Sequence, residues 1–86
     1  MNQAIQFPER EWWDESTRAV CFTALANGFQ LVCAIHGEEL LRRYHDEPSA
    51  LDAFRRHRWD LEEDATQAIE QQSENDQGWI WLSSAR

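Results

Sequence analysis

The sequence predicts an α+β fold: a mostly antiparallel sheet of about four strands, with two helices packed on one face. Two β-rich apolar runs joined by Asn27-Gly28 indicate a hairpin, and two later segments repeat apolar residues at helical spacing. A short alternating run over residues 4–7, ended by Pro8, and the final run WIWL indicate two further strands. The expected order is therefore β-ββ-α-α-β, within one domain that spans residues 1–86.

The hairpin is expected over residues 19–35. Asn-Gly is the preferred pair for a two-residue type I′ turn, because both residues tolerate positive φ. That loop places Phe22 opposite Cys33 and gives the hairpin one wholly apolar face. The other face is mixed and carries Cys21 and His36. A slip of one residue would destroy this segregation, so the sequence favours this register.

Two helices are expected between the hairpin and the last strand. In residues 38–44, glutamates stand at the start and arginines at the end, which opposes the helix dipole and allows i,i+4 ion pairs. Ser49 is a good N-cap for a second, longer helix that is expected to run to Gln72. Its apolar residues recur at helical spacing and form one stripe. Phe54 and Leu61 belong to this stripe and are expected in the core.

The composition favours a folded chain and excludes several classes of partner. A hydrophobic content of 42% with five Trp argues against disorder, although 28% of the residues are charged. The net charge of −8 repels phosphate backbones, so nucleic acid is not expected as a partner. No apolar run approaches the roughly 18 residues of a membrane span, and the N-terminus does not resemble a signal peptide. A cytoplasmic location is therefore expected, with no membrane partner.

The run RRHRWDLEED, residues 55–64, sets positive charge against negative charge around a tryptophan. On a helix, residues four apart face each other, so the run is typical of a solvated face with weak ion pairs. An acidic stretch that begins at once cancels the local positive field, which disfavours nucleic-acid recognition here. The expected i,i+4 pairs are Asp52–Arg56, Arg56–Asp60 and Arg58–Glu62.

A sharper interpretation takes Arg55, Arg58 and Trp59 as an anchor for an acidic or planar protein partner. Trp59 lies well off the apolar stripe, which is unusual for a large aromatic side chain. Trp59 is therefore expected to be at least partly exposed and to belong to a protein–protein contact. The alternative is that the first helix covers it through Leu41 or Tyr44.

Sequence patterns of common catalytic and metal sites are missing, so no cofactor and no metal are expected. The glycines are too far apart for a phosphate loop, and the chain has neither CxxC nor HExxH. Residues 45–47, His-Asp-Glu, are typical of a solvated turn rather than of a metal site. Cys21 and His36 are diagonal neighbours on the mixed hairpin face and could form a thiol dyad, although small buried thiols are the commoner arrangement.

With these segments in view, the chain resembles a family of small bacterial proteins, domain-of-unknown-function family 1488. The resemblance covers nearly the whole chain: MNQAIQF, the Trp13-Asp14 pair, CFTALANGFQLVCAI and the helical segment RWDLEE. It implies a compact α+β domain of Gram-negative bacteria. It implies no activity and no functional residues, so it supports the fold alone.

The leading hypothesis for function is a non-enzymatic protein-interaction or regulatory module, with an unidentified protein partner or a second copy of the chain. Trp59, the mixed hairpin face and the aromatic residues near both termini would supply the contact surface. Two alternatives stay open. The chain could be an acidic inhibitor that mimics the charge of nucleic acid, or a minor thiol enzyme that uses Cys21 and His36.

Overall fold

The structure, a computed structural model, describes residues 5–71 and 78–82 and confirms the predicted α+β class. The described part contains five strands and three helices, one more of each than the sequence predicted. In chain order the elements are β1 (Ile5–Gln6), β2 (Glu11–Asp14), β3 (Ala19–Ala26), β4 (Phe29–His36), α1 (Gly37–Arg43), α2 (Ala50–Arg56), α3 (Arg58–Glu70) and β5 (Trp79–Trp81).

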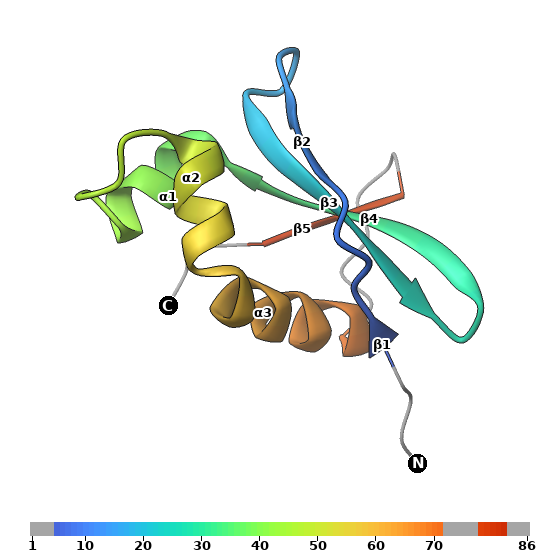
Figure 1. The fold of residues 1–86 in the computed structure, drawn as a ribbon. Helices are drawn as coiled ribbons and strands as arrows, with labels where there is room; N and C mark the ends of the chain where they lie inside the picture. The colour runs from blue at the N-terminus through green and yellow to red at the C-terminus, as the bar shows by residue number, and fades with distance from the viewer. Residues whose placement is uncertain (1–4, 72–77, 83–86) are drawn as a thin grey trace.

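The sheet is mostly antiparallel, as predicted, and is built around the β3–β4 hairpin. Its strand order is β1-β3-β4-β5, and β2 also pairs with β3. β1 pairs with the end of β3 and β2 with its beginning, so the two short strands share one edge of β3. β5 lies on the other side, parallel to β4. The chain passes through the three helices before it reaches β5, which lies next to β4 in the sheet (Figure 1).

The predicted hairpin register is correct. Phe22 lies opposite Cys33, and the pairing runs without interruption from Ala19–His36 to Ala26–Phe29. Asn27 and Gly28 have φ angles of 56° and 83°, the left-handed values that a type I′ turn requires. The two-residue loop therefore sets which side chains face the helices.

The prediction of one long second helix is wrong, because the helix breaks at His57. Ser49 caps the helix as expected, since its Oγ accepts a hydrogen bond from the Asp52 N–H at 3.1 Å. His57 has φ −112° and ψ 30°, so α2 ends there and α3 begins at the next residue. The His57 ring stacks on Tyr44 with 3.7 Å between ring centroids. The apolar stripe continues across this break, which explains why the sequence pattern did not reveal it.

The sequence analysis did not predict β2, whose residues are EWWD. Acidic side chains at both ends and two adjacent tryptophans do not alternate between polar and apolar, so the period of a strand is absent. The first predicted strand corresponds to β1, which covers Ile5–Gln6, and Ala4 lies outside the described residues. Gln72, where the second helix was expected to end, lies outside them too.

The main core lies between the sheet and the three helices, which follow one another along one side of it (Figure 1). The predicted burial of Phe54 and Leu61 is confirmed, because both are fully enclosed. The helix-facing residues of the hairpin pack against them, as the expected register requires. A smaller apolar cluster lies on the opposite face, where Trp79 and Trp81 pack against Ala19, Cys21 and Ala34. The helices therefore lie on one face, as predicted.

Candidate functional site

Two of the predicted binding residues, Arg55 and Arg58, bind a carboxylate of the chain itself. Arg55 Nε donates to Glu11 Oε2 at 2.9 Å, and Arg58 donates to Glu11 Oε1. Glu11 begins β2 and lies opposite Phe22, so its side chain is on the helix-facing side of the sheet. The Arg58 guanidinium also lies 4.9 Å from the centre of the Phe54 ring. These contacts join β2 to α2 and α3.

The electrostatics of this Glu11 cluster favour the ionised carboxylate. Partial burial by itself would raise the pKa of the Glu11 carboxyl, because a charge is less stable away from water. The hydrogen bond from Arg55 and the nearby charge of Arg58 outweigh that effect and hold the pKa below its ordinary value. Both guanidinium groups therefore already have an anionic partner, which leaves less positive charge for an acidic ligand.

Trp59, the third predicted residue, is 84% exposed at the start of α3. The first helix does not cover it, because Tyr44 stacks on His57 and Leu41 lies in a pocket on another side. The expected exposure of Trp59 is confirmed. The structure thus brings Arg55 and Arg58 together at Glu11 and leaves Trp59 next to them, facing solvent.

The ion pairs expected within this helix face are only partly present. Arg58 pairs with Glu62 at 3.5 Å, as predicted. Arg56 instead pairs with Glu47 at 3.2 Å, and Asp52 is engaged by the Ser49 hydroxyl at 3.1 Å. Glu47 precedes α2, so an i,i+4 rule could not identify it as a partner.

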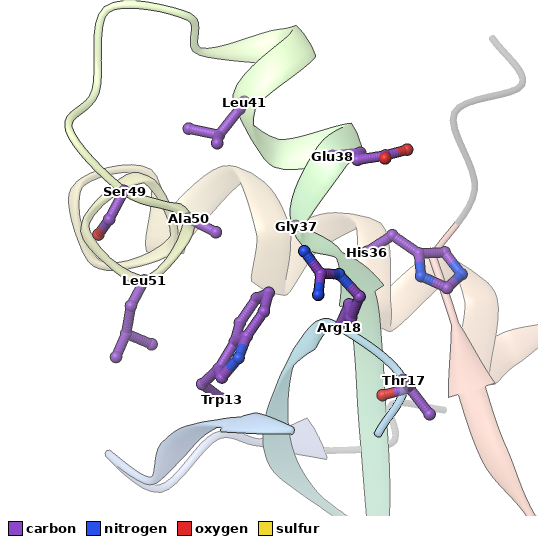
Figure 2. A pocket seen from close by; sticks show the side chains of 10 residues that line it. All are labelled: Trp13, Thr17, Arg18, His36, Gly37, Glu38, Leu41, Ser49, Ala50 and Leu51. Atoms are coloured by element: carbon purple, nitrogen blue, oxygen red, sulfur yellow. The ribbon is translucent and has the colours of Figure 1, made fainter. Parts of the chain in front are cut away.

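A second candidate site is an apolar pocket of about 660 Å³ between the β2–β3 turn and the starts of α1 and α2. Figure 2 shows the Trp13 ring standing in its middle, with Leu41 and Leu51 approaching from the helices. Trp13 and Leu41 are each 37% exposed, so their apolar surfaces are open to a ligand. The sequence did not indicate this pocket, because its walls come from separate segments.

The walls of the pocket are held in place by close packing and by a tight turn. A Cβ added to Gly37 would lie 2.8 Å from Trp13 Cη2, so the ring fits against glycine alone. The Trp13 indole N–H donates to Glu15 Oε1 at 2.9 Å. In the turn, Asp14 accepts hydrogen bonds from the Thr17 N–H at 3.1 Å and from its hydroxyl at 2.5 Å. The hydrogen bond from the Thr17 hydroxyl is the largest influence that lowers the pKa of Asp14.

The Cys21–His36 pair lacks the features of an activated thiol. Cys21 is fully buried, and this burial, assisted by the charge of Asp14, raises the pKa of its thiol to about 11. Burial also raises the pKa of Cys33 to about 12. The His36 ring stacks on Trp81 with 4.5 Å between centroids. A nucleophilic cysteine needs a lowered pKa, so this environment opposes thiol catalysis.

In residues 5–71 and 78–82, no three His, Cys, Asp or Glu side chains gather closely enough to hold a metal ion. None of the helices in this part of the chain has the length and apolar character that crossing a membrane requires.

Residues 5–82 match the model of a family described as "Protein of unknown function (DUF1488)". The chain belongs to this family. The "Uncharacterized protein YrdB" of Escherichia coli (strain K12) is 62% identical over 84 residues, which is 95% of this chain and 99% of that protein. A protein of the same name from Shigella flexneri matches equally well. These matches confirm the resemblance found in the sequence.

A solved structure of a DUF1488 protein is similar in fold to this chain. It comes from Shewanella loihica PV-4, is 35% identical, and superposes with a TM-score of 0.87 over 95% of this chain and 94% of its own. It is described as a protein of unknown function, and the Escherichia coli relative as uncharacterized.

Proposed function

We propose that this DUF1488 domain is a protein-interaction module, with Trp59 as the anchor of the contact. The observation that carries the proposal is the 84% exposure of this tryptophan on a helix held firmly to the sheet. A large aromatic side chain left in water gains much when a partner covers it, and tryptophan is over-represented among residues that dominate binding energy.

The Glu11 cluster supports the anchor by fixing the surface around it. Arg58 precedes Trp59 directly and is tied both to Glu11 and to Glu62. A rigid platform loses little conformational entropy on binding, so more of the contact energy is available for affinity. Because Arg55 and Arg58 are already paired, the geometry favours a planar or apolar partner surface over an acidic one.

The charge of the chain favours a different protein over a second copy. Two copies, each with a net charge of −8, repel one another. Asp60 and Glu63 are exposed on the same helix as Trp59. We therefore expect the partner to offer an apolar pocket with a neutral or basic rim.

A photo-cross-linking amino acid at position 59 tests the proposal in cells that produce the protein. Position 29 is the matched control, because Phe29 is also an exposed aromatic residue, 72% accessible, but lies at the hairpin tip. We expect one discrete protein adduct from position 59 and none of that size from position 29. Equal adducts from both positions, or none from position 59, would contradict the proposal.

Once the adduct is identified, Trp59→Ala tests the energetics with the purified pair. Loss of a central aromatic anchor is expected to weaken binding by at least tenfold. The melting temperature of the free protein should hardly change, because the side chain makes little contact with its own fold. A large fall in that temperature would show that Trp59 supports the fold instead.

A further inference from the structure

The pocket beside Trp13 is a binding site of a different kind, and it does not include Trp59. We propose that it binds a small monocarboxylate with an aromatic or branched apolar body, and that Arg18 holds the carboxylate. The proposal concerns a free small molecule. It goes beyond the protein contact and does not depend on it.

The apolar part of the ligand follows from the walls of the pocket. Trp13, Leu41 and Leu51 offer a flat ring and two branched side chains around one space, as Figure 2 shows. A volume of about 660 Å³ lies within the range of small-molecule sites, which bury most of the ligand among apolar and aromatic side chains. The Trp13 ring is fixed before a ligand binds, because it packs against Gly37 and its indole N–H donates a hydrogen bond to Glu15.

The charged part of the ligand follows from Arg18. No ion pair joins its guanidinium to a carboxylate of the described residues, whereas Arg42, Arg43, Arg55, Arg56 and Arg58 are all paired. Figure 2 shows the side chain rising from the turn towards Gly37, beside the Trp13 ring. In a chain with a net charge of −8, a cation that pairs with no carboxylate of residues 5–71 and 78–82 and lies at the rim of an apolar pocket is complementary to an amphipathic anion.

The fold fixes the backbone from which the Arg18 side chain extends. Its φ is 56°, a left-handed conformation that costs energy in any residue except glycine. The conformation is held because the Arg18 carbonyl accepts a hydrogen bond from the Gly37 N–H at 2.9 Å. The hydrogen bond thus fixes the backbone of Arg18 beside Gly37, the residue against which the Trp13 ring fits.

The surrounding charges limit the ligand to a single negative charge. Glu15 and Glu38 lie close to the pocket, and the Glu38 side chain points away from Trp13 in Figure 2. One arginine offsets one carboxylate, but a phosphate ester or a dicarboxylate would add charge next to these glutamates. Such ligands are disfavoured by repulsion.

Titration of the purified protein with 4-phenylbutyrate, followed by NMR, tests the site. The Trp13 indole N–H signal is assigned by its disappearance in Trp13→Phe. We expect it to shift in a saturable manner, while the Trp59 indole signal stays in place. The neutral analogue 4-phenylbutyramide should bind more weakly. A shift that does not saturate, or that is equal at Trp13 and Trp59, would overturn the proposal.

Removal of the cation separates the role of Arg18 from general charge effects. Arg18→Asn should weaken the binding of 4-phenylbutyrate about two- to fivefold, which is the range expected for an exposed ion pair. The binding of 4-phenylbutyramide should not change. Arg18→Gly repeats the test in a residue that adopts positive φ freely. Arg10→Asn is the matched control, since Arg10 is exposed, makes no ion pair with the described residues, and lies outside the pocket.

Two further results would overturn the assignment. The first is equal weakening in the Arg10 and Arg18 variants, because the effect would then come from net charge alone. The second is tighter binding of the capped peptide acetyl-Leu-Phe-amide than of 4-phenylbutyrate at Trp13, because the pocket would then take a protein segment and not a free carboxylate.

Discussion

At the residue scale, the Glu11 carboxylate shows how a single side chain can organise a surface. It accepts hydrogen bonds from Arg55 and Arg58, 44 and 47 residues away along the chain. Local helix spacing correctly predicted the Arg58–Glu62 pair but could not predict these, because a partner on a strand leaves no periodic trace. The sequence therefore predicted that Arg55, Arg58 and Trp59 are neighbours. It did not predict that Arg55 and Arg58 bind Glu11 of the same chain.

Phe54 allows a direct test of the core. It is fully buried, and its ring centroid lies 4.8 Å from that of Phe22. Phe54→Ala should lower the free energy of unfolding by about 3–5 kcal/mol, because the cavity cannot close completely. Trp59→Ala is the matched control and should change it by less than about 0.5 kcal/mol. Urea denaturation of both variants measures the difference, and similar losses would mean that the burial is misassigned.

The two thiols should be inert in the native protein. With pKa values raised to about 11 and about 12, Cys21 and Cys33 hold only a trace of thiolate at pH 8. Ellman's reagent should therefore label neither at pH 8, and both should react once urea unfolds the chain. Rapid labelling of Cys21 before unfolding would support a thiol enzyme instead.

At the scale of elements, a feature could be predicted when the residues that determine it are close together in the sequence. The hairpin register was predictable residue by residue, because the Asn-Gly turn and the alternation of side chains act over short distances. The break at His57 was not, because the His57 ring stacks on Tyr44, which directly follows α1, and such a contact leaves no periodic trace in the sequence. The pocket could not be predicted either, since its walls come from separate segments and the fit of Trp13 against Gly37 leaves no trace in the local sequence.

The β3–β4 turn provides a test of backbone geometry. Gly28 has a φ of 83° and open space around its Cα, so a side chain there would cause strain but no clash. Gly28→Ala should cost about 1–2 kcal/mol of stability, the penalty for a left-handed L-residue. Asn27→Gly is the control and should be nearly neutral, because glycine tolerates the φ of 56° at that position. Thermal melting of the two variants distinguishes strain from a general weakness of the hairpin.

At the scale of the whole molecule, ion pairs connect the helices to the sheet and to one another. Glu11 joins β2 to α2 and α3. Arg43 joins α1 to α3 through Asp64 at 2.9 Å and also pairs with Glu39 within α1 at 2.8 Å. Partial burial alone would raise the pKa of Glu39, but hydrogen bonds from Arg43 and Arg42 hold it below its ordinary value. The helical layer thus depends on carboxylates that must stay ionised.

This dependence predicts a loss of stability in acid. A carboxyl whose pKa is lowered by folding contributes stability that is present above its unfolded pKa, near 4.5, and is lost as pH falls through its folded pKa. Glu11→Gln should cost about 1–3 kcal/mol at pH 7 and should reduce the change in stability between about pH 5 and pH 3. Glu63→Gln, an exposed residue of α3, is the control. Parallel pH profiles for Glu11→Gln and the wild type would contradict the role of Glu11.

The parallel pairing of β5 with β4 has a consequence for the order of folding. The β3–β4 hairpin closes through a two-residue loop, whereas β5 can reach Val32, Cys33 and Ala34 only after the chain has passed through all three helices. Long-range pairing of this kind forms slowly, because the intervening chain must first be ordered. Until β5 arrives, the edge of β4 presents unpaired backbone groups, which is where another chain could attach and begin aggregation.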